Sequence, residues 1–306
     1  MTARPGTPPA GPSPGPPEPG PRAPAVDVLR AGALTTVQDL GRPGWAHLGV
    51  PRSGALDPAA LRLANRLVGN PETAAGLELT LTGCALRFSR ATTVAVTGAD
   101  ADVRISDRPG DVGRPLAVPA GAVLQIGPPR TGLRCWLAVA GGIDVEPVLG
   151  SRATDTLSGL GPPPLRDGDR LPLGPPAGPP APVDVTVTVP PPVEVRLALR
   201  LGPREDWFAP LALDRLFGTA YTLSPVSNRV GARLTGAPLP RAVAGELPSE
   251  GLVLGAVQVP ADGQPLVFLA DHPTTGGYPV IGVVDDVAPL AQARPGTTVT
   301  FHGPQR

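Results

Sequence analysis

Lysine is absent from the 306 residues, so all 26 basic side chains are arginine. A Walker-type phosphate loop, a Schiff-base enzyme and a biotin carrier each depend on a lysine amine, and the chain itself can be none of these. The 26 acidic residues balance the arginines, so no net charge favours a nucleic acid or an acidic membrane surface. We therefore expect neither as a partner.

Cysteine and histidine are too scarce for a disulfide framework or a metal centre. Cys84 and Cys135 each lie in an apolar, strand-like stretch, which predicts two small core residues. The histidines, His47, His272 and His302, lie far apart in the sequence, so no metal site is predicted. The start of the chain lacks the blocks of a signal peptide, and no apolar run reaches the about 18 residues of a membrane helix. We expect a cytoplasmic protein without membrane contact.

Proline and glycine are abundant and divide the chain. Residues 1–25 contain too little apolar surface to offset ordering and are predicted to form a disordered tail, with a docking peptide as the alternative. Two proline clusters between 162 and 192 predict a domain boundary. The predicted domains cover residues 26–190 and 191–306.

Short runs of alternating apolar and polar residues dominate the sequence after the tail. They are rich in Val, Ile, Leu and Thr and are bounded by Gly, Pro or Asp, as β-strands are. The runs are "TTVAVTG", "ADVRIS", "AVLQIG", "RCWLAVAGGIDV", "VDVTVTV", "VEVRLALRLG", "LVFLA" and "TVTFHG". The predicted fold class is therefore mostly β.

Three helices are predicted between these runs. The clearest lies in "LDPAALRLANRLVGNPE", where Asp57 is a good N-cap, Pro58 suits the first helical position and Gly69 ends the apolar periodicity. The other two lie in "EDWFAPLALDRLFG" and "DDVAPLAQAR". Each follows a polar loop, so helix N-termini can point into a site.

Several long motifs resemble a known family. They are "TTVQDLGRPGWAHLGVPRSGALD", "LANRLVGNPE", "AGGI", "SNRVGARLTG", "LPSEGLVLGAVQVPADGQPLVFLADHPTTGGYPVIG" and "LAQARPG". In this order they resemble the biotin-dependent carboxyltransferase family, also called allophanate hydrolase subunit 2, whose bacterial members include the C subunit of 5-oxoprolinase. The resemblance covers nearly everything after residue 26. It implies two cyclophilin-like, mostly antiparallel β-barrel domains with a few short helices.

The resemblance also implies an activity and partners. The activity is the ATP-dependent opening of the lactam of 5-oxo-L-proline to give L-glutamate. The implied partners are an allophanate hydrolase subunit 1-like protein, similar to the B subunit of 5-oxoprolinase, and a lactam-cleaving subunit. ATP, with Mg, would act at the level of that complex.

Two alternative functions stay open, because a fold does not choose a function. One is a carboxyltransferase subunit that uses biotin carried on another chain, as in urea carboxylase. The other is a regulatory module without enzyme activity, from a kinase-inhibitor antagonist pair.

The stretch "ADHPTTGGYPVIG" holds the densest set of candidate site residues. Asp271 and His272 end a predicted strand and are the candidate proton carriers. The hydroxyls of Thr274 and Thr275, the backbone amides of Gly276 and Gly277, and Tyr278 as a cap predict a loop that binds a carboxylate or phosphate. The alternative is a tight connection between strands with a capping aspartate.

Three further motifs contribute candidate substrate-binding groups. Arg52 and Ser53 precede the first helix, and Asn228 with Arg229 combines an amide and a guanidinium suited to a small polar substrate. Ser249 and Glu250 can hold a substrate or a metal–nucleotide. Each motif has a structural alternative as a turn or a cap. Glu78, in a strand between leucines, must find a partner or face solvent.

Overall fold

The computed structural model describes residues 23–180, 193–245 and 247–303. The predicted tail lies outside this part of the chain except for residues 23–25, and so do the predicted strand at 183–189 and the predicted domain boundary at 190. Within the described ranges, no helix combines the length and the apolar character needed to cross a lipid bilayer.

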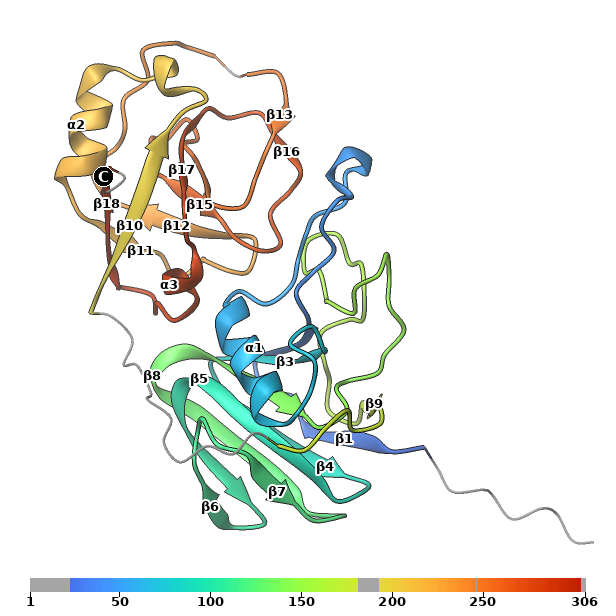
Figure 1. The fold of residues 1–306 in the computed structure, drawn as a ribbon. Coiled ribbons are helices and arrows are strands. Elements are labelled where there is room, and N and C mark those ends of the chain that lie inside the picture. Colours follow the sequence, from blue (N-terminus) through green and yellow to red (C-terminus); the bar gives the residue numbers. More distant parts are fainter. Residues whose placement is uncertain (1–22, 181–192, 246, 304–306) are drawn as a thin grey trace, which may run out of the picture.

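The N-terminal half of the described chain forms one sheet, in the lower part of Figure 1. Its hydrogen-bonded order is β2-β3-β8-β4-β1-β9, and β5 pairs with β6, β7 and β8. Because β2 and β9 are the two ends of this order, the sheet is open between them, and we call it the half-barrel. Its strands are β1 (Ala25–Arg30), β2 (Leu34–Gln38), β3 (Gly76–Thr80), β4 (Cys84–Phe88), β5 (Thr92–Ile105), β6 (Arg108–Gly110), β7 (Leu116–Val118), β8 (Val123–Val139) and β9 (Arg170–Pro172).

The C-terminal half forms a closed barrel with the order β10-β17-β14-β15-β12-β11-β18. Its pairs are antiparallel except for β10 with β18, which run parallel, as in the mostly antiparallel barrel that the resemblance implies. Two short strands, β13 (Glu250–Gly251) and β16 (Thr275–Gly276), pair separately. The barrel strands are β10 (Glu194–Leu201), β11 (Tyr221–Leu223), β12 (Gly231–Thr235), β14 (Ala256–Gln258), β15 (Leu266–Phe268), β17 (Val280–Val284) and β18 (Thr298–His302).

The prediction of a mostly β fold with few helices is confirmed, although some strand limits differ. The two predicted strands within 92–106 are joined in β5, and those within 122–145 are joined in β8 up to residue 139. The two long strands pair with each other, and their register shifts near Gly98 and Asp100. A β-bulge of this kind accommodates extra residues in one strand, so the pairing of the two strands continues past them.

Each α-helix has a proline at its first or second position. In α1 (Pro58–Leu67), the Asp57 carboxylate accepts a hydrogen bond of 2.9 Å from the Ala60 amide, which confirms the predicted cap. The second predicted helix divides into a 3-10 turn, η2 (Glu205–Trp207), and α2 (Pro210–Gly218). The third is the short α3 (Ala288–Ala291). Proline lacks an amide hydrogen and favours the first helical turn, which explains the later start of α2.

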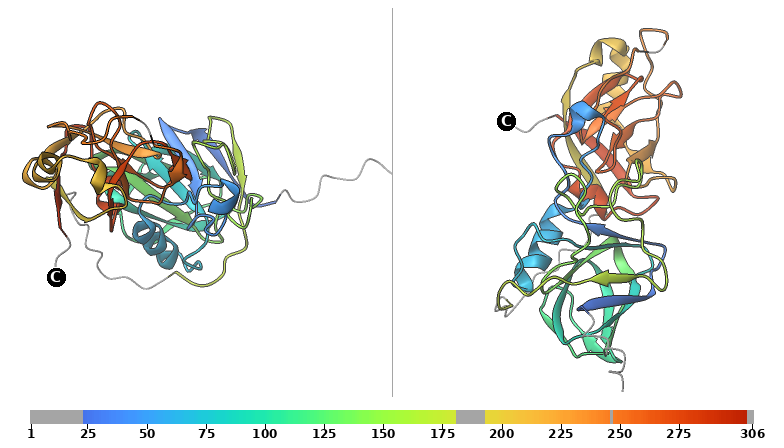
Figure 2. Two further views of the ribbon diagram at one scale, coloured as in Figure 1. Left: turned by 90° about the horizontal axis from the view of Figure 1, so that it is seen from above. Right: turned by 90° about the vertical axis from the view of Figure 1, so that its right-hand side faces the viewer.

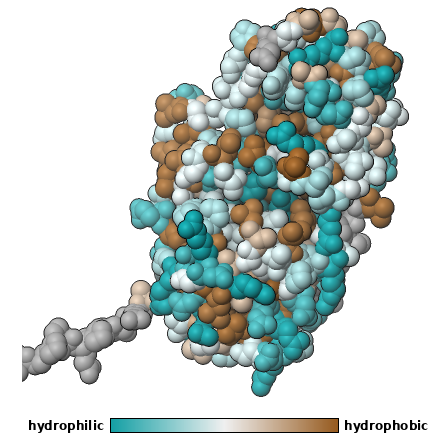
Figure 3. Space-filling model, turned by 180° about the vertical axis from the view of Figure 1, so that it is seen from behind, coloured by the Kyte–Doolittle hydropathy of each residue, from teal (hydrophilic) through white to brown (hydrophobic). Residues whose placement is uncertain are grey.

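A hydrophobic core joins the half-barrel to the barrel. Leu56, Leu61 and Trp136 from the half-barrel belong to the same buried cluster as Val257 and Phe301 inside the barrel. The two β units are stacked along the long axis of the molecule (Figure 2). From behind, hydrophobic residues reach the surface around the middle of the molecule (Figure 3).

The second core fills the half-barrel and contains both cysteines, as predicted. Cys84 and Cys135 are free and buried, and burial raises the pKa of each thiol to about 12. They therefore remain protonated and act as small apolar side chains.

The loop between β2 and α1 rises from the half-barrel and runs beside the barrel (Figures 1 and 2). It contains the 3-10 turn η1 (Ala46–Leu48), and a Cβ placed on Gly49 would lie 4.0 Å from the Thr274 hydroxyl. The loop therefore brings the predicted Arg52 and Ser53 of one half toward the predicted His272 of the other.

Candidate functional site

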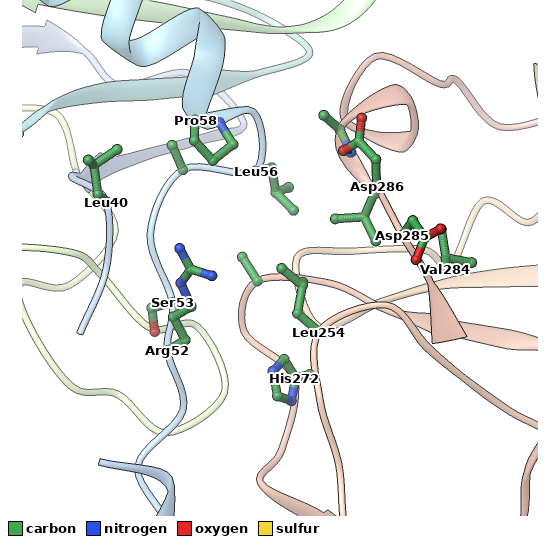
Figure 4. Close-up of a pocket in the computed structure, with 14 residues that line it drawn as sticks. Leu40, Arg52, Ser53, Leu56, Pro58, Leu254, His272, Val284, Asp285 and Asp286 are labelled. Atoms are coloured by element: carbon green, nitrogen blue, oxygen red, sulfur yellow. The ribbon is translucent and has the colours of Figure 1, made fainter. Parts of the chain in front are cut away.

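A cavity of about 150 Å³ lies between the half-barrel and the barrel, and we call it the first cavity. Figure 4 shows Arg52 and Ser53 on one wall, His272 below them, and Asp285 and Asp286 on the other side. Apolar side chains fill the rest of the lining, among them Leu40, Leu56, Leu254 and Val287. A concave, largely apolar pocket with a few convergent polar groups is the usual form of a small-molecule site.

Ser53 is fixed between the two halves by its backbone and its hydroxyl. Its amide donates to the Ala270 carbonyl at 3.0 Å, and its side chain is only 4% exposed. The hydroxyl donates to Asp155 at 2.7 Å and accepts from Arg42 at 3.2 Å. Ser53 also has φ of +54°, a left-handed conformation that is uncommon outside glycine. The serine is therefore held in place, with its hydrogen-bonding capacity largely committed.

Arg52 differs, because its side chain is exposed at the cavity and makes no hydrogen bond or ion pair to the described residues. Only its backbone carbonyl is engaged, by the Arg42 amide at 2.8 Å. An unpaired guanidinium beside an apolar pocket can take a carboxylate in a bidentate arrangement.

His272 is a buried, neutral imidazole at the base of the first cavity. Its Nδ1 lies 2.7 Å from the Pro273 carbonyl oxygen, which can only accept, so Nδ1 carries the proton and Nε2 is left as the basic nitrogen. Burial lowers the pKa of His272, partly opposed by the Pro273 hydrogen bond and by the nearby Asp271 carboxylate. The ring is available as a proton acceptor near neutral pH.

Asp285 and Asp286 were not predicted as site residues. Asp286 accepts from the Ala288 amide at 2.9 Å with one oxygen, and Asp285 forms a 2.6 Å ion pair with Arg200. The sequence carried a signal for both, since they immediately precede the predicted helix in "DDVAPLAQAR". They give the first cavity an acidic wall opposite Arg52.

Asp271 and Arg229 lie in the interior rather than in the first cavity. Arg229 makes two 2.9 Å hydrogen bonds to Asp271 and pairs with Glu78 at 2.5 Å, and these three side chains are at most 1% exposed. Arg134 lies 3.6 Å from Glu78. We call Glu78, Arg134, Arg229 and Asp271 the ion network. It connects β3 and β8 of the half-barrel to the barrel.

Glu78, Arg229 and Asp271 are each compensated by their partners in the ion network. Burial opposes the ionised form of Glu78, but Arg229 and Arg134 together hold its pKa below the usual range. Burial likewise opposes the charge of Arg229, and Glu78 and Asp271 more than offset it, so its pKa is raised. Asp271 also accepts two hydrogen bonds from Thr156, at 3.0 Å and 2.6 Å. Asp271 is thus saturated by partners, which leaves no free oxygen for proton transfer.

The predicted anion-binding loop adopts a different conformation from the one expected. Gly276 pairs with Glu250 between β16 and β13, and neither Gly276 nor Gly277 has a positive φ. A backbone nest requires residues of alternating hand, so this glycine pair does not form one. A Cβ at Gly276 would lie 2.7 Å from the Gln258 amide nitrogen, so close packing accounts for the glycine.

The remaining predicted residues lie around this small sheet or elsewhere. Thr274 is partly buried, Thr275 is exposed, and Tyr278 has the Arg241 guanidinium 5.9 Å from its ring centre. Glu250 pairs with Arg204, Ser249 directly precedes it, and Asn228 lies at a separate cavity beside Arg229. The structure therefore gathers Arg52, Ser53 and His272 and leaves the other predicted residues outside the first cavity.

Comparisons of this chain with a family model and with known proteins agree on one family. The family model described as carboxyltransferase domain, subdomain A and B, matches residues 48–303. Over 279 residues the chain is 42% identical to the 5-oxoprolinase C subunit of Escherichia coli (strain K12), covering 90% of this chain and 89% of that protein. It is 34% identical to urea amidolyase of Lachancea kluyveri, covering 90% of this chain but 17% of that enzyme.

A solved structure agrees with the sequence comparison. The crystal structure of the K. lactis urea amidolyase superimposes with a TM-score of 0.86 at 31% identity, covering 93% of this chain and 19% of that one. The chain thus spans most of the bacterial subunit but only a small part of each amidolyase.

Proposed function

We propose that this chain, which belongs to the carboxyltransferase domain family with subdomains A and B, is a subunit of a 5-oxoprolinase-type enzyme. The reaction is the conversion of 5-oxo-L-proline to L-glutamate, coupled to ATP hydrolysis. The 42% identity to a 5-oxoprolinase C subunit over nearly the full length of both chains supports this assignment.

The arrangement of charge in the first cavity carries the substrate assignment. 5-Oxoproline has a carboxylate and a lactam N–H on one small ring. The unpaired Arg52 guanidinium suits the carboxylate, and the Asp286 carboxylate across the cavity suits the N–H. The volume of about 150 Å³ suits a ligand of this size.

His272 and Ser53 have distinct roles in this proposal. The unprotonated Nε2 of His272 accepts a proton from the water that attacks the lactam carbonyl and returns it to the ring nitrogen as the C–N bond breaks. The Ser53 hydroxyl donates to Asp155 and accepts from Arg42, and these contacts fix its position. It holds the Arg52 backbone in position at the cavity wall.

ATP does not fit the first cavity. Pockets for drug-sized ligands measure about 300–1,000 Å³, whereas this one measures about 150 Å³. A triphosphate would also bring its negative charge against Asp285 and Asp286. We therefore place ATP and its Mg at the level of the complex and assign no step through them to this chain. An allophanate hydrolase subunit 1-like protein and a lactam-cleaving subunit are the proposed partners, and the cytoplasm is the proposed location.

The test uses the purified subunits mixed with 5-oxoproline and ATP, with glutamate and ADP as readouts. Arg52→Gln should lower the rate by about a hundredfold, mainly through weaker substrate binding, because the carboxylate loses its only cationic partner in the cavity. Arg87→Gln makes the same change on β4, at an exposed position outside the cavity, and should keep the wild-type rate.

Two outcomes would contradict the proposal. If the assembled complex of folded subunits forms no glutamate or ADP above background, the proposed 5-oxoprolinase activity is wrong. Equal rates for Arg52→Gln and Arg87→Gln would place the substrate outside the first cavity while leaving the activity itself intact.

A second function is supported by the relatives named urea amidolyase. Urea also fits the first cavity and has N–H groups for Asp285 and Asp286. Any biotin must arrive on another chain, because this one has no lysine to carry it. Formation of carboxylated urea with a biotinylated partner, without turnover of 5-oxoproline, would favour this alternative.

A further inference from the structure

A short turn in the connection between β8 and β9 contacts the chain neighbours of both Arg52 and His272. In Figure 1 this connection rises beside the loop that leads to α1. We call residues 155–158 the clamp turn. Asp155 is 2% exposed, whereas Thr156 and the two residues after it lie at the surface. Contacts made by the clamp turn can therefore act on both residues of the site at once.

Asp155 holds the Arg52 side of the first cavity. Its Oδ1 accepts from the amides of Leu157 and Ser158, each at 2.8 Å, which fixes the carboxylate within the turn. Its Oδ2 accepts from the Ser53 hydroxyl at 2.7 Å. Ser53 follows Arg52 directly, and its φ of +54° is a conformation that a residue with a side chain keeps only where its surroundings impose it. Asp155 therefore helps to fix the backbone from which the Arg52 side chain extends.

Thr156 holds the His272 side of the first cavity. Its amide and its hydroxyl both donate to Oδ2 of Asp271, at 3.0 Å and 2.6 Å. Asp271 is completely buried and directly precedes His272, and its carboxylate is also paired with Arg229 just before β12 of the barrel. Thr156 contacts the same carboxylate from the half-barrel. It therefore helps to fix where the His272 backbone lies relative to the half-barrel.

The two contacts belong to one closed ring of residues. The Ser53 amide donates to the Ala270 carbonyl at 3.0 Å, and Ala270 directly precedes Asp271. The ring runs from Ser53 through Asp155 and Thr156 to Asp271 and returns through Ala270. Because every link in the ring is a hydrogen bond or a peptide bond, the loss of one link frees the adjacent residues to shift.

We propose that Asp155 and Thr156 are positioning residues that set the separation of Arg52 from His272. This inference rests on the function proposed above, in which Arg52 binds the substrate carboxylate and His272 transfers a proton. Both positioning residues lie outside the lining of the first cavity, so they act through the residues that they hold. Asp155 therefore affects the binding of the substrate, and Thr156 affects the transfer of the proton.

The experiment measures glutamate formation by the assembled complex at saturating ATP and over a range of 5-oxoproline concentrations. Thr156→Val removes the hydroxyl donor to Asp271 but keeps the amide donor. His272 should lose its alignment, so kcat should fall about tenfold while KM stays nearly unchanged.

Asp155→Asn tests the other side of the ring. Its amide oxygen can still accept from the two amides of the clamp turn, so its NH₂ group faces the Ser53 hydroxyl, which already accepts from Arg42. The Ser53 hydroxyl loses its acceptor, and the backbone of Arg52 should shift. KM should therefore rise about tenfold, with a smaller loss in kcat.

Two further variants separate positioning from a general structural effect. Thr156→Ser restores the hydroxyl and should recover most of the wild-type kcat. Thr154→Val is the matched control, because it makes the same substitution two residues earlier, where the hydroxyl is buried and has no hydrogen bond to the described residues. It should keep both constants at the wild-type values.

Three results would overturn the proposal, and they are distinguishable from one another. Equal kcat values for Thr156→Val and Thr154→Val in an active complex would exclude the role of Thr156. A wild-type KM in Asp155→Asn would exclude the role of Asp155, and the two variants are read independently if one fails to assemble. A wild-type complex without turnover of 5-oxoproline would instead overturn the proposed function, and the positioning roles with it.

Discussion

The ion network and the first cavity contain the same kinds of side chain within a few residues of each other. In the ion network, Arg229 is 1% exposed and pairs with the carboxylates of Glu78 and Asp271, so its positive charge is compensated inside the protein. At the first cavity, Arg52 is exposed and has no partner among the described residues. The network therefore links the two halves through paired, buried charges, while the cavity keeps groups available for a ligand.

The largest expected effect comes from breaking the ion network. Arg229→Met leaves Glu78 and Asp271 as buried charges without their main partner, and we expect a loss of about 3–5 kcal/mol in the free energy of unfolding. Urea denaturation measures it, and Arg233→Met, on exposed β12 surface, is the matched control. A change as small as that of the control would mean that the network does not stabilise the interface.

Ser53 lies in the wall of the first cavity, but like the residues of the ion network it is buried and hydrogen-bonded to charged side chains. Ser53→Ala removes hydrogen bonds to Asp155 and Arg42, both buried, and should cost about 1–3 kcal/mol of unfolding free energy. The same urea titration measures this cost. Loss of enzyme activity with unchanged stability would instead give the serine a direct role with the substrate.

His272 should make stability depend on pH in a defined direction. Its pKa is lowered in the folded protein, so the unfolded chain binds more protons, and stability is complete above about pH 6.5 and falls as the pH drops through the folded-state pKa. The neutral His272→Gln should lose less stability than the wild type between about pH 7 and pH 5. Parallel stability curves for the two proteins would contradict the assignment of a buried, neutral imidazole.

The smallest effect is expected at the exposed ion pair of Arg204 with Glu250. Both side chains are about one-third exposed, at 37% and 33%, and water screens their attraction. Arg204→Gln should therefore give no resolvable change in the urea midpoint. A loss as large as that of Ser53→Ala would show that this pair acts more like the buried network.

Local features of the fold were predictable because their causes lie close together in the chain. The Asp57 cap and Pro58 start α1 within four residues, and alternating apolar residues mark most of the strands. The buried cysteines followed from their apolar neighbours. The closure of one sheet and the parallel pairing of β10 with β18 join residues about 100 positions apart, which no local pattern encodes.

The candidate site was only partly predictable for the same reason. Arg52, Ser53 and His272 were chosen by type and do converge on one cavity. Asp271 and Arg229 were chosen by the same reasoning, yet they form buried pairs with Glu78 and Thr156, the latter from an irregular segment without periodicity. A sequence motif indicates which groups are available, but not which of them are already paired.

The amino-acid sequence settled the mostly β character, the family motifs and the lack of any lysine chemistry, since each depends on residue type and local order. It also required Glu78 to find a partner, without naming Arg229, 151 residues away. Only the folded chain decides which arginine is saturated and which is free. That choice depends on burial and on distances between residues of the two halves, and these exist only once the half-barrel and the barrel are packed together.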